Sequence, residues 1–315
     1  MTRNNERGVA LILVLLVLAL LATIVLQFDA EARRGIREAA LFRDSVKATT
    51  LGRAGVEAAR AILQRDQQLD EESGPATDGL TDIWARPIPS YQVGDGVLSV
   101  TIEDERGKFN VNDLAGRPDP LARQAKILRL KRLFALLQID PLLVDAIADW
   151  VDADDVPEPN GAERAYYLAL IPPYRPANGP LQSLGDLRLI KGFSDELVRR
   201  VSKYLTVYPL PADGWINLNT ADPAVIQALH PHLTTAMVSD LVQRRPFRLI
   251  QDVDQVATVE PIAKELRLQG AYAVRSDHFS VHITATTHGV TKYVHAIIRR
   301  SNIRGADSVL FQSIQ

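Results

Sequence analysis

Residues Val9 to Leu26 read VALILVLLVLALLATIVL, a run of eighteen residues in which only Thr23 is polar. A helix rises 1.5 Å per residue, so extension to Phe28 gives about 30 Å, the hydrocarbon thickness of a bilayer. A cleaved secretory signal has a shorter apolar region and a small-x-small site, whereas polar residues follow this run directly. The run predicts a membrane-spanning helix. A generic signal anchor would look the same, so any finer assignment needs the flanking residues.

The helical pattern continues beyond the membrane run. No proline precedes Pro75, and apolar residues recur at helical spacing from Ala39 to Leu63. We therefore predict one helix from Val9 to about Gln68, about 90 Å long, half in lipid and half packed on a soluble head. Three glycines are expected to weaken and bend it: Gly35, Gly52 and Gly55.

Composition and charge exclude several classes of protein. The chain has 315 residues, 46% of them hydrophobic and 23% charged, which is ordinary for one large or two smaller globular domains. The net charge of −2 argues against a protein that mainly binds polyphosphates. The absence of cysteine excludes disulfides, thiolate metal sites and cysteine nucleophiles.

The residues before the membrane run resemble a prepilin leader, in which a short charged peptide ends in glycine ahead of an apolar helix. Here Arg7 and Gly8 precede Val9. The resemblance implies cleavage between Gly8 and Val9 by a prepilin peptidase, followed by methylation of the new amine. Most pilins carry glutamate at the fifth mature position, whereas this chain has Leu13. A missing glutamate is characteristic of minor pseudopilin K, also called general secretion pathway protein K (GspK), the proposed tip of the type II secretion pseudopilus.

Two segments show the period-two alternation of strands. They are Tyr91 to Glu105 and Phe279 to Arg300, and the second has a turn near His288-Gly289. The region between them, Asn112 to Ala271, is dense in leucine and alanine and predicts helices. We therefore expect an α+β head whose first and last parts pair in space around a helical insertion.

The insertion contains a faint internal repeat. Phe109-Asn-Val-Asn112 and Ile216-Asn-Leu-Asn219 each precede helical segments, which predicts two related units. The second unit resembles helix-hairpin-helix modules that bind the DNA backbone. Such modules hold phosphate with a glycine-rich hairpin, whereas this chain has Pro231 there, which removes a donor. A structural role is favoured. The alternative is a membrane-anchored DNA-binding protein of competence type, using Arg244, Arg245 and Arg248.

An acidic stretch is the most distinctive part of the sequence. From Ala148 to Asn178 it reads ADWVDADDVPEPNGAERAYYLALIPPYRPAN and resembles the corresponding segment of minor pseudopilin K. Carboxylates this close repel, and a hard cation that takes oxygen ligands would relieve the repulsion. The resemblance implies calcium here, and the predicted ligands are Asp152, Asp154, Asp155 and Glu163. The alternative is a solvated turn with Asn160 capping a helix from Ala162.

No catalytic residues are predicted. The chain lacks G-x-S-x-G and H-E-x-x-H patterns, its six histidines are scattered, and no base adjoins the carboxylates. His282 and His295 fall in strand patterns, where packed or surface histidines are expected.

The predicted fold class is α+β and pilin-like, with a long N-terminal transmembrane helix, an antiparallel sheet and an inserted α-helical domain with helix-hairpin-helix-like units. The predicted boundaries are 1–8 for the leader, 9–28 for the transmembrane part, 29–110 for the first part of the head, 111–271 for the insertion and 272–315 for the last strands. The resemblance implies a non-catalytic pseudopilus tip subunit that acts in protein secretion. Its implied partners are minor pseudopilins I and J and the prepilin peptidase, with no nucleic acid, and its implied location is the inner membrane with a periplasmic C-terminal domain.

Overall fold

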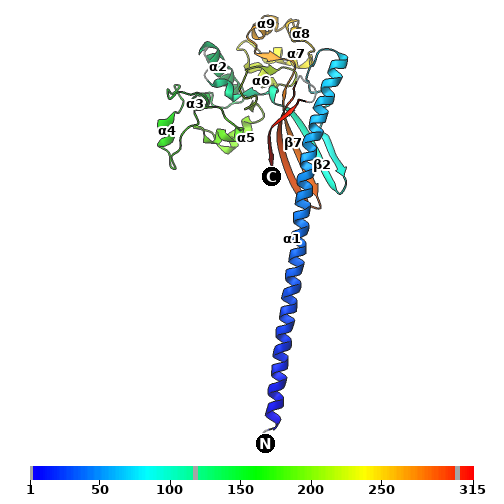
Figure 1. Cartoon of the computed structure of the whole chain (residues 1–315). Coiled ribbons are helices and arrows are strands. Elements are labelled where there is room, and N and C mark those ends of the chain that lie inside the picture. The colour runs from blue at the N-terminus through cyan, green and yellow to red at the C-terminus, as the bar shows by residue number, and fades with distance from the viewer. Residues whose placement is uncertain (1–2, 116–119, 302–305) are drawn as a thin grey trace.

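The longest element is α1 (Arg3–Ser73), a single helix of 71 residues. The computed structural model of the chain describes residues 3–115, 120–301 and 306–315. The N-terminal half of α1 stands clear of the rest of the chain (Figure 1), and every residue from Val9 to Leu26 is exposed. The predicted single helix is confirmed, and it extends past both predicted ends because no helix-breaking residue interrupts it before Gly74.

Two glycines in α1 have a different role from the predicted one. A Cβ atom at Gly52 would lie 2.6 Å from Val294 Cγ2, and one at Gly55 would lie 3.0 Å from Ile283 Cγ2. These glycines let the helix approach the sheet closely without ending it. The expected weakening is offset because the same face of α1 buries Val56, Ala59 and Leu63 against the sheet.

The head is a five-stranded antiparallel sheet packed on the C-terminal half of α1. Its order is β1-β2-β7-β8-β9. The strands are β1 (Ile88–Val93), β2 (Gly96–Asp104), β7 (His278–Thr287), β8 (Val290–Arg299) and β9 (Ser308–Ile314). Strand β2 pairs with β7 from Gly96↔Thr287 to Asp104↔Phe279, so segments more than 170 residues apart lie side by side. The predicted pairing of the first and last parts of the head is confirmed.

The turn between β7 and β8 falls at the predicted position. His288 and Gly289 have φ values of 47° and 85°, the left-handed conformation of a two-residue hairpin turn. The register of this hairpin places His282 directly opposite His295. Most residues of one face, including Val281, Ile283 and Val294, are buried towards α1, whereas the two histidines lie on the other face.

The chain between β2 and β7 forms helices and short strand pairs. Its α-helices are α2 (Pro120–Leu136), α3 (Leu143–Val151), α4 (Arg164–Leu168), α5 (Asp195–Val201), α6 (Pro223–Ala228), α7 (Thr235–Gln243), α8 (Ile250–Asp254) and α9 (Glu260–Leu268). Its 3-10 helices are η1 (Glu105–Gly107), η2 (Val111–Leu114) and η3 (Leu184–Leu189). The parallel pairs are β3 (Phe109–Asn110) with β4 (Leu205–Thr206), and β5 (Ile216–Asn217) with β6 (Tyr272–Ala273). This insertion has its own apolar core and lies at the end of α1 far from the N-terminus (Figure 1).

The two predicted units of the insertion repeat the same hydrogen bonds. In the first unit, Asn112 Nδ2 donates to the carbonyls of Leu181 and Val207, and its Oδ1 accepts from the amide of Leu181. In the second, Asn219 Nδ2 donates to the carbonyls of Phe247 and Val274, and its Oδ1 accepts from the amide of Phe247. Each asparagine therefore ties three segments of its unit together. The short parallel pairs, which periodicity did not predict, close each unit at this point.

Buried polar residues join the insertion to the head. Asn217 Nδ2 donates to the Asp78 carbonyl at 3.0 Å, to Asp104 Oδ2 at 3.0 Å and to Ser276 Oγ at 2.8 Å. Burial raises the pKa of the Asp104 carboxyl to about 6, although the hydroxyls of Ser276 and Thr220 oppose that shift by donating to it. The junction is thus held by directional bonds, which fix the orientation of the insertion on the sheet.

Candidate metal centre

The acidic loop of the sequence connects two short helices at the outer end of the insertion. Asp152 caps the C-terminus of α3 and Glu163 stands at the N-cap position of α4. One carboxylate oxygen from each of Asp152, Asp154 and Glu163 lies within 4.8 Å of the others. The loop therefore folds back and brings together three of the four predicted ligands.

Several oxygen atoms in this cluster are buried without a hydrogen-bond partner. They are Asp152 Oδ1, both carboxylate oxygens of Glu163, and Asp149 Oδ2. Asp152 and Glu163 are each 6% exposed. Arg123 donates to Asp152 Oδ2 at 2.7 Å and to Glu158 at 2.6 Å, so it neutralises only one side of the cluster. Buried anionic oxygens without partners are costly, and an oxygen-binding cation would satisfy them.

Without a cation, the cluster favours protonation. Burial raises the pKa of Glu163 to about 7, and the nearby Asp149 and Asp152 charges add to that effect. Burial also raises the pKa of Asp152 to about 6, with a contribution from Asp154 that exceeds the opposing effect of Arg123. These carboxyls therefore keep their protons to a higher pH than free side chains do.

Two residues in this region differ from the sequence-based expectation. Asp155 is exposed and lies outside the three-residue cluster, where its Oδ1 accepts a hydrogen bond of 3.3 Å from Asn178 Nδ2. Asn160 does not cap a helix from Ala162; α4 begins at Arg164 and Asn160 Nδ2 donates to Asp145.

Sequence reasoning missed Asp149 and Asn178. Asp149 accepts the Glu158 amide at 3.0 Å, and a Cβ atom at Gly161 would lie 1.8 Å from its Oδ2, so only glycine fits there. Asn178 donates to the Asp154 carbonyl, and its own Oδ1 is buried without a partner. The available signal was the spacing of Asp149 and Asp152, since residues three apart share a helix face.

Aromatic side chains pack together at the ends of the two helices that flank the loop. Tyr167 in α4 is fully buried, with its ring 5.2 Å from Trp150 of α3 and 5.4 Å from Tyr174. These contacts fix the ends of the two helices that carry Asp152 and Glu163. Trp150, Tyr167 and Tyr174 thus form one aromatic cluster beside the loop.

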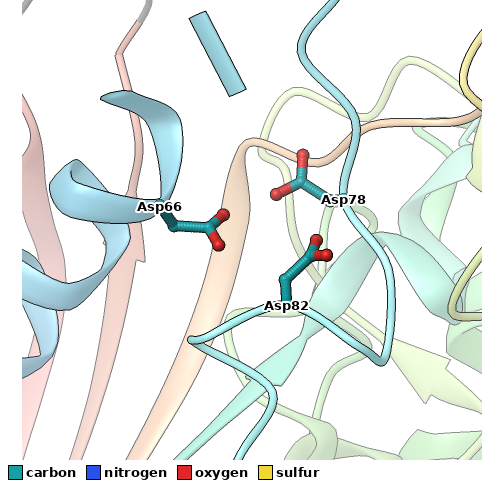
Figure 2. Close-up of side chains that lie close together, drawn as sticks. All are labelled: Asp66, Asp78 and Asp82. Carbon is teal, nitrogen blue, oxygen red and sulfur yellow. The ribbon is translucent and has the colours of Figure 1, made fainter. Parts of the chain in front are cut away.

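A second group of carboxylates lies where α1 meets the head, and Figure 2 shows Asp66, Asp78 and Asp82 pointing towards one another. This group already contains a cation, because Arg300 Nη2 lies 2.6 Å from Asp78 Oδ1 and 2.5 Å from Oδ2. The Ser276 amide also donates to Asp78. The two clusters therefore differ in chemistry: Arg300 and the Ser276 amide pair with Asp78 in this one, whereas buried oxygens of Asp152 and Glu163 in the loop have no hydrogen-bond partner among the described residues.

Two of the three basic residues of the DNA-binding alternative are engaged within the chain, whereas Arg248 is exposed. Arg244 pairs with Asp240 at 2.7 Å, and Arg245 donates to the Ala221 carbonyl at 2.7 Å. Burial lowers the pKa of Arg245 to about 10. A phosphate backbone needs exposed cations and converging amides, so this arrangement does not favour the alternative.

The N-terminal candidate residues lie on α1. Gly8 and Val9 are helical, and Leu13 is 58% exposed on the apolar surface. The helix from Val9 is long and apolar enough to cross a membrane, and its most apolar 18-residue stretch is not buried against the rest of the chain. Membrane anchoring by α1 is therefore supported by both composition and exposure.

Comparisons with known proteins agree over most of the chain. Two family models described as "Type II secretion system (T2SS), protein K" match residues 107–210 and 216–282, which divides the insertion between its two repeated units. Type II secretion system protein K of Pseudomonas aeruginosa is 34% identical over 234 residues, 72% of this chain and 69% of the relative. The same protein of Pectobacterium carotovorum is 31% identical over 298 residues, 89% of this chain and 88% of the relative.

A solved structure shares the fold. A chain of the GspK-GspI-GspJ complex from the type 2 secretion system of enterotoxigenic Escherichia coli superposes with a TM-score of 0.75 and 21% identity. The match covers 88% of this chain and 99% of that one. The pilin-like α+β head with a helical insertion is confirmed.

Proposed function

This chain belongs to the type II secretion system protein K family, the minor pseudopilins of that system, and we propose that it caps the pseudopilus as a non-catalytic tip subunit. The observation that carries the proposal is the position of the insertion, at the end of α1 far from the N-terminus (Figure 1). A pilus grows by stacking parallel α1 helices. A body of this width at the head would exclude a further subunit above it by steric overlap.

The residue at Leu13 is consistent with that position. A carboxylate in an apolar helix bundle needs a cationic partner, and leaving it alone costs several kcal/mol. In the family's assembled filaments the partner is the amine of the subunit ahead, which a tip subunit lacks. An exposed leucine at this point of α1 avoids the uncompensated charge.

We propose minor pseudopilins I and J as partners. The part of α1 between the membrane run and the head carries apolar side chains that this chain leaves exposed, and helices of other pilin-like subunits would cover them. They are Ile36, Leu41, Phe42 and Val46, with exposed fractions of 70%, 59%, 74% and 49%. The shared fold with a chain from the solved three-protein complex supports the same choice.

The proposed location is the inner membrane, with one pass by α1 and the head in the periplasm. Cleavage between Gly8 and Val9 by a prepilin peptidase, with methylation of Val9, would precede assembly. The proposal of a non-catalytic role is supported by the acidic loop, where the carboxylates of Asp152 and Glu163 are buried at the ends of α3 and α4, although Asp154 is exposed. A buried cluster of this kind suits a structural ion better than a substrate.

Co-purification and N-terminal sequencing test this function. The tagged chain, expressed with the other secretion components, is expected to begin at Val9 and to purify with two pilin-like proteins. Phe42→Glu should abolish that association, because it places a charge on the exposed apolar stripe of α1. Leu268→Glu is the matched control, since Leu268 is 81% exposed on α9 of the insertion. A chain that still begins at Met1 and purifies alone contradicts the proposal.

The Leu13→Glu variant separates a tip from an internal position. At the tip, the added carboxylate has no amine ahead of it, so secretion is expected to stay unchanged or fall. The measurement is the amount of exported substrate in a strain that carries only the variant chain. A marked rise in pseudopilus assembly or secretion would show that the subunit normally has a neighbour ahead of it.

We also propose that the acidic loop binds Ca²⁺ through Asp152, Asp154 and Glu163. The bare buried oxygens of Asp152 and Glu163 support this assignment, and Asp149 Oδ2 and Asn178 Oδ1 are further oxygens at the same loop. Calcium accepts six to eight oxygen ligands in flexible geometry, which suits an irregular loop. The bound ion would supply the charge balance that Arg123 provides only in part.

Calcium is expected to raise the melting temperature of the full chain by roughly 5–10 °C at about 100 times the dissociation constant. Glu163→Gln should remove most of that rise, because the substitution replaces one of the two buried carboxylate oxygens by an NH2 group and removes the negative charge. Asp155→Asn is the control, since Asp155 lies outside the cluster and should keep the full response. Scanning calorimetry with and without chelator gives the comparison, and an unchanged melting temperature of the native chain removes the claim.

A further inference from the structure

Two histidines form a cross-strand pair on the face of the sheet that points away from α1. His282 of β7 is directly opposite His295 of β8, and their ring centroids lie 4.8 Å apart with planes inclined by 15°. The same row of the sheet continues to Thr101 of β2 and to Ser313 of β9. A fixed antiparallel register holds the two Cβ atoms at a constant separation, so the pair is preorganised by the backbone.

The two imidazoles are available for a ligand. Within the described part of the chain, neither ring makes a hydrogen bond with another residue. Their aromatic contacts are with each other and, for His295, with Phe311 at 5.8 Å. His282 is exposed and His295 is half-buried. Burial lowers the pKa of His295, and a charge on His282 would lower it further, so the half-buried ring is held in its neutral form.

The spacing of the rings matches that of two imidazoles on one metal ion. In a tetrahedral site with metal–nitrogen distances of about 2.0–2.1 Å, the centroids of two bound rings lie about 5 Å apart. The observed separation is 4.8 Å. The rings are stacked, so binding a shared ion would require each ring to rotate about its Cβ–Cγ bond, a rotation that leaves the ring centres nearly fixed. The exposed His282 has room for that rotation.

The pair lies in a cleft between the sheet and the insertion. The cleft has a volume of about 480 Å³ and is lined by both histidines together with Glu103, Ser280 and Ser313. A site with two protein ligands keeps positions open, and this volume admits water molecules or a further donor to fill them. The cleft is thus wide enough for a hydrated ion.

We propose that His282 and His295 form a binding site for a borderline divalent transition-metal ion such as Zn²⁺, with the remaining coordination positions open to the cleft. Imidazole nitrogen selects zinc, nickel and copper, whereas calcium prefers oxygen. The site is therefore chemically distinct from the carboxylate cluster of the acidic loop. Its ligands come from adjacent strands, so a bound ion would also bridge β7 and β8 on the face opposite α1.

Zinc titration of the full chain in detergent, prepared without a polyhistidine tag and with excess Ca²⁺ present, tests the site. Excess calcium competes with zinc for carboxylate oxygens, including those of the acidic loop, so that the zinc that still binds reports on imidazole sites. Isothermal titration calorimetry is expected to show that one zinc ion binds per chain. His282→Asn and His295→Asn should each lower the zinc affinity by at least about tenfold, because each removes one of two protein ligands. Copper bound at the same site should show hyperfine coupling to two nitrogens in its electron paramagnetic resonance spectrum.

A second histidine pair supplies the matched control. His230 and His232 have ring centroids 5.3 Å apart, but His230 Nδ1 already accepts the His232 amide and its Nε2 faces Glu265 at 3.5 Å. His232→Asn is expected to leave the zinc equivalent unchanged. The proposal is wrong if His282→Asn and His295→Asn bind zinc like the native chain, or if the equivalent is lost only in His232→Asn. Metal-free melting temperatures within about 2 °C of the native chain show that the variants are folded.

Discussion

Replacing Arg300 by alanine is expected to destabilise the chain by about 3–5 kcal/mol and to lower its melting temperature by roughly 10 °C or more. Arg300 is 8% exposed and Asp78 is fully buried, with the guanidinium 2.5 Å from the carboxylate. Arg300 Nη2 also donates to the Ser276 carbonyl at 2.8 Å. Truncation would leave the Asp78 charge buried without its cation, which costs more than the attraction of the pair itself.

Two further variants separate this effect from a general loss of charge. Arg188→Ala removes an exposed pair, since Arg188 and Asp195 are 52% and 67% exposed, and should change stability by less than about 1 kcal/mol. The double variant Arg300→Met with Asp78→Asn should recover much of the loss, because the buried Asp78 charge is removed together with its cation. Thermal unfolding followed by circular dichroism measures all of them. An Arg300→Ala chain that melts like the native one would show that the junction does not depend on this pair.

The carboxyl of Asp66, beside that pair, is expected to make stability depend on pH near neutrality. Burial raises its pKa from 3.8 to about 7, with Asp82 and Asp78 adding to the shift and Arg300 opposing it. The folded chain therefore binds a proton that the unfolded chain releases between pH 3.8 and about 7. This contribution to stability is complete at low pH and is lost as the pH rises through about 7. Discounted for partial solvent screening, it amounts to roughly 2 kcal/mol.

Asp66→Asn should flatten this dependence and stabilise the chain at about pH 8. The amide keeps the shape of the protonated carboxyl but cannot ionise. Asp70 and Asp104, whose pKa values burial raises to about 6, leave a residual slope at lower pH. Asp240→Asn is the control, because Arg244 lowers the pKa of Asp240 and places its titration below this range. Urea unfolding from about pH 5 to pH 8, with calcium present, gives the curves; parallel curves for Asp66→Asn and the native chain would refute the assignment.

Elements that depend on residues close together in the sequence were predictable from it. The membrane helix follows from an unbroken apolar run and the absence of proline before Pro75. The strands and the turn at His288-Gly289 follow from alternation and from a glycine that tolerates positive φ. The repeat was visible because its two asparagines stand in the same local pattern, at Asn112 and Asn219.

Local spacing along the chain is enough to predict the membrane-spanning run, the strands and the loop that gathers acidic residues. Which charges are compensated depends instead on contacts between distant segments. Arg300 reaches Asp78 across 222 residues, whereas Glu163 is buried with no partner among the described residues. The register of β7 and β8 in the folded sheet likewise places His282 opposite His295. Burial and pairing are properties of segments that meet in space, so neither periodicity nor charge spacing along the chain encodes them directly.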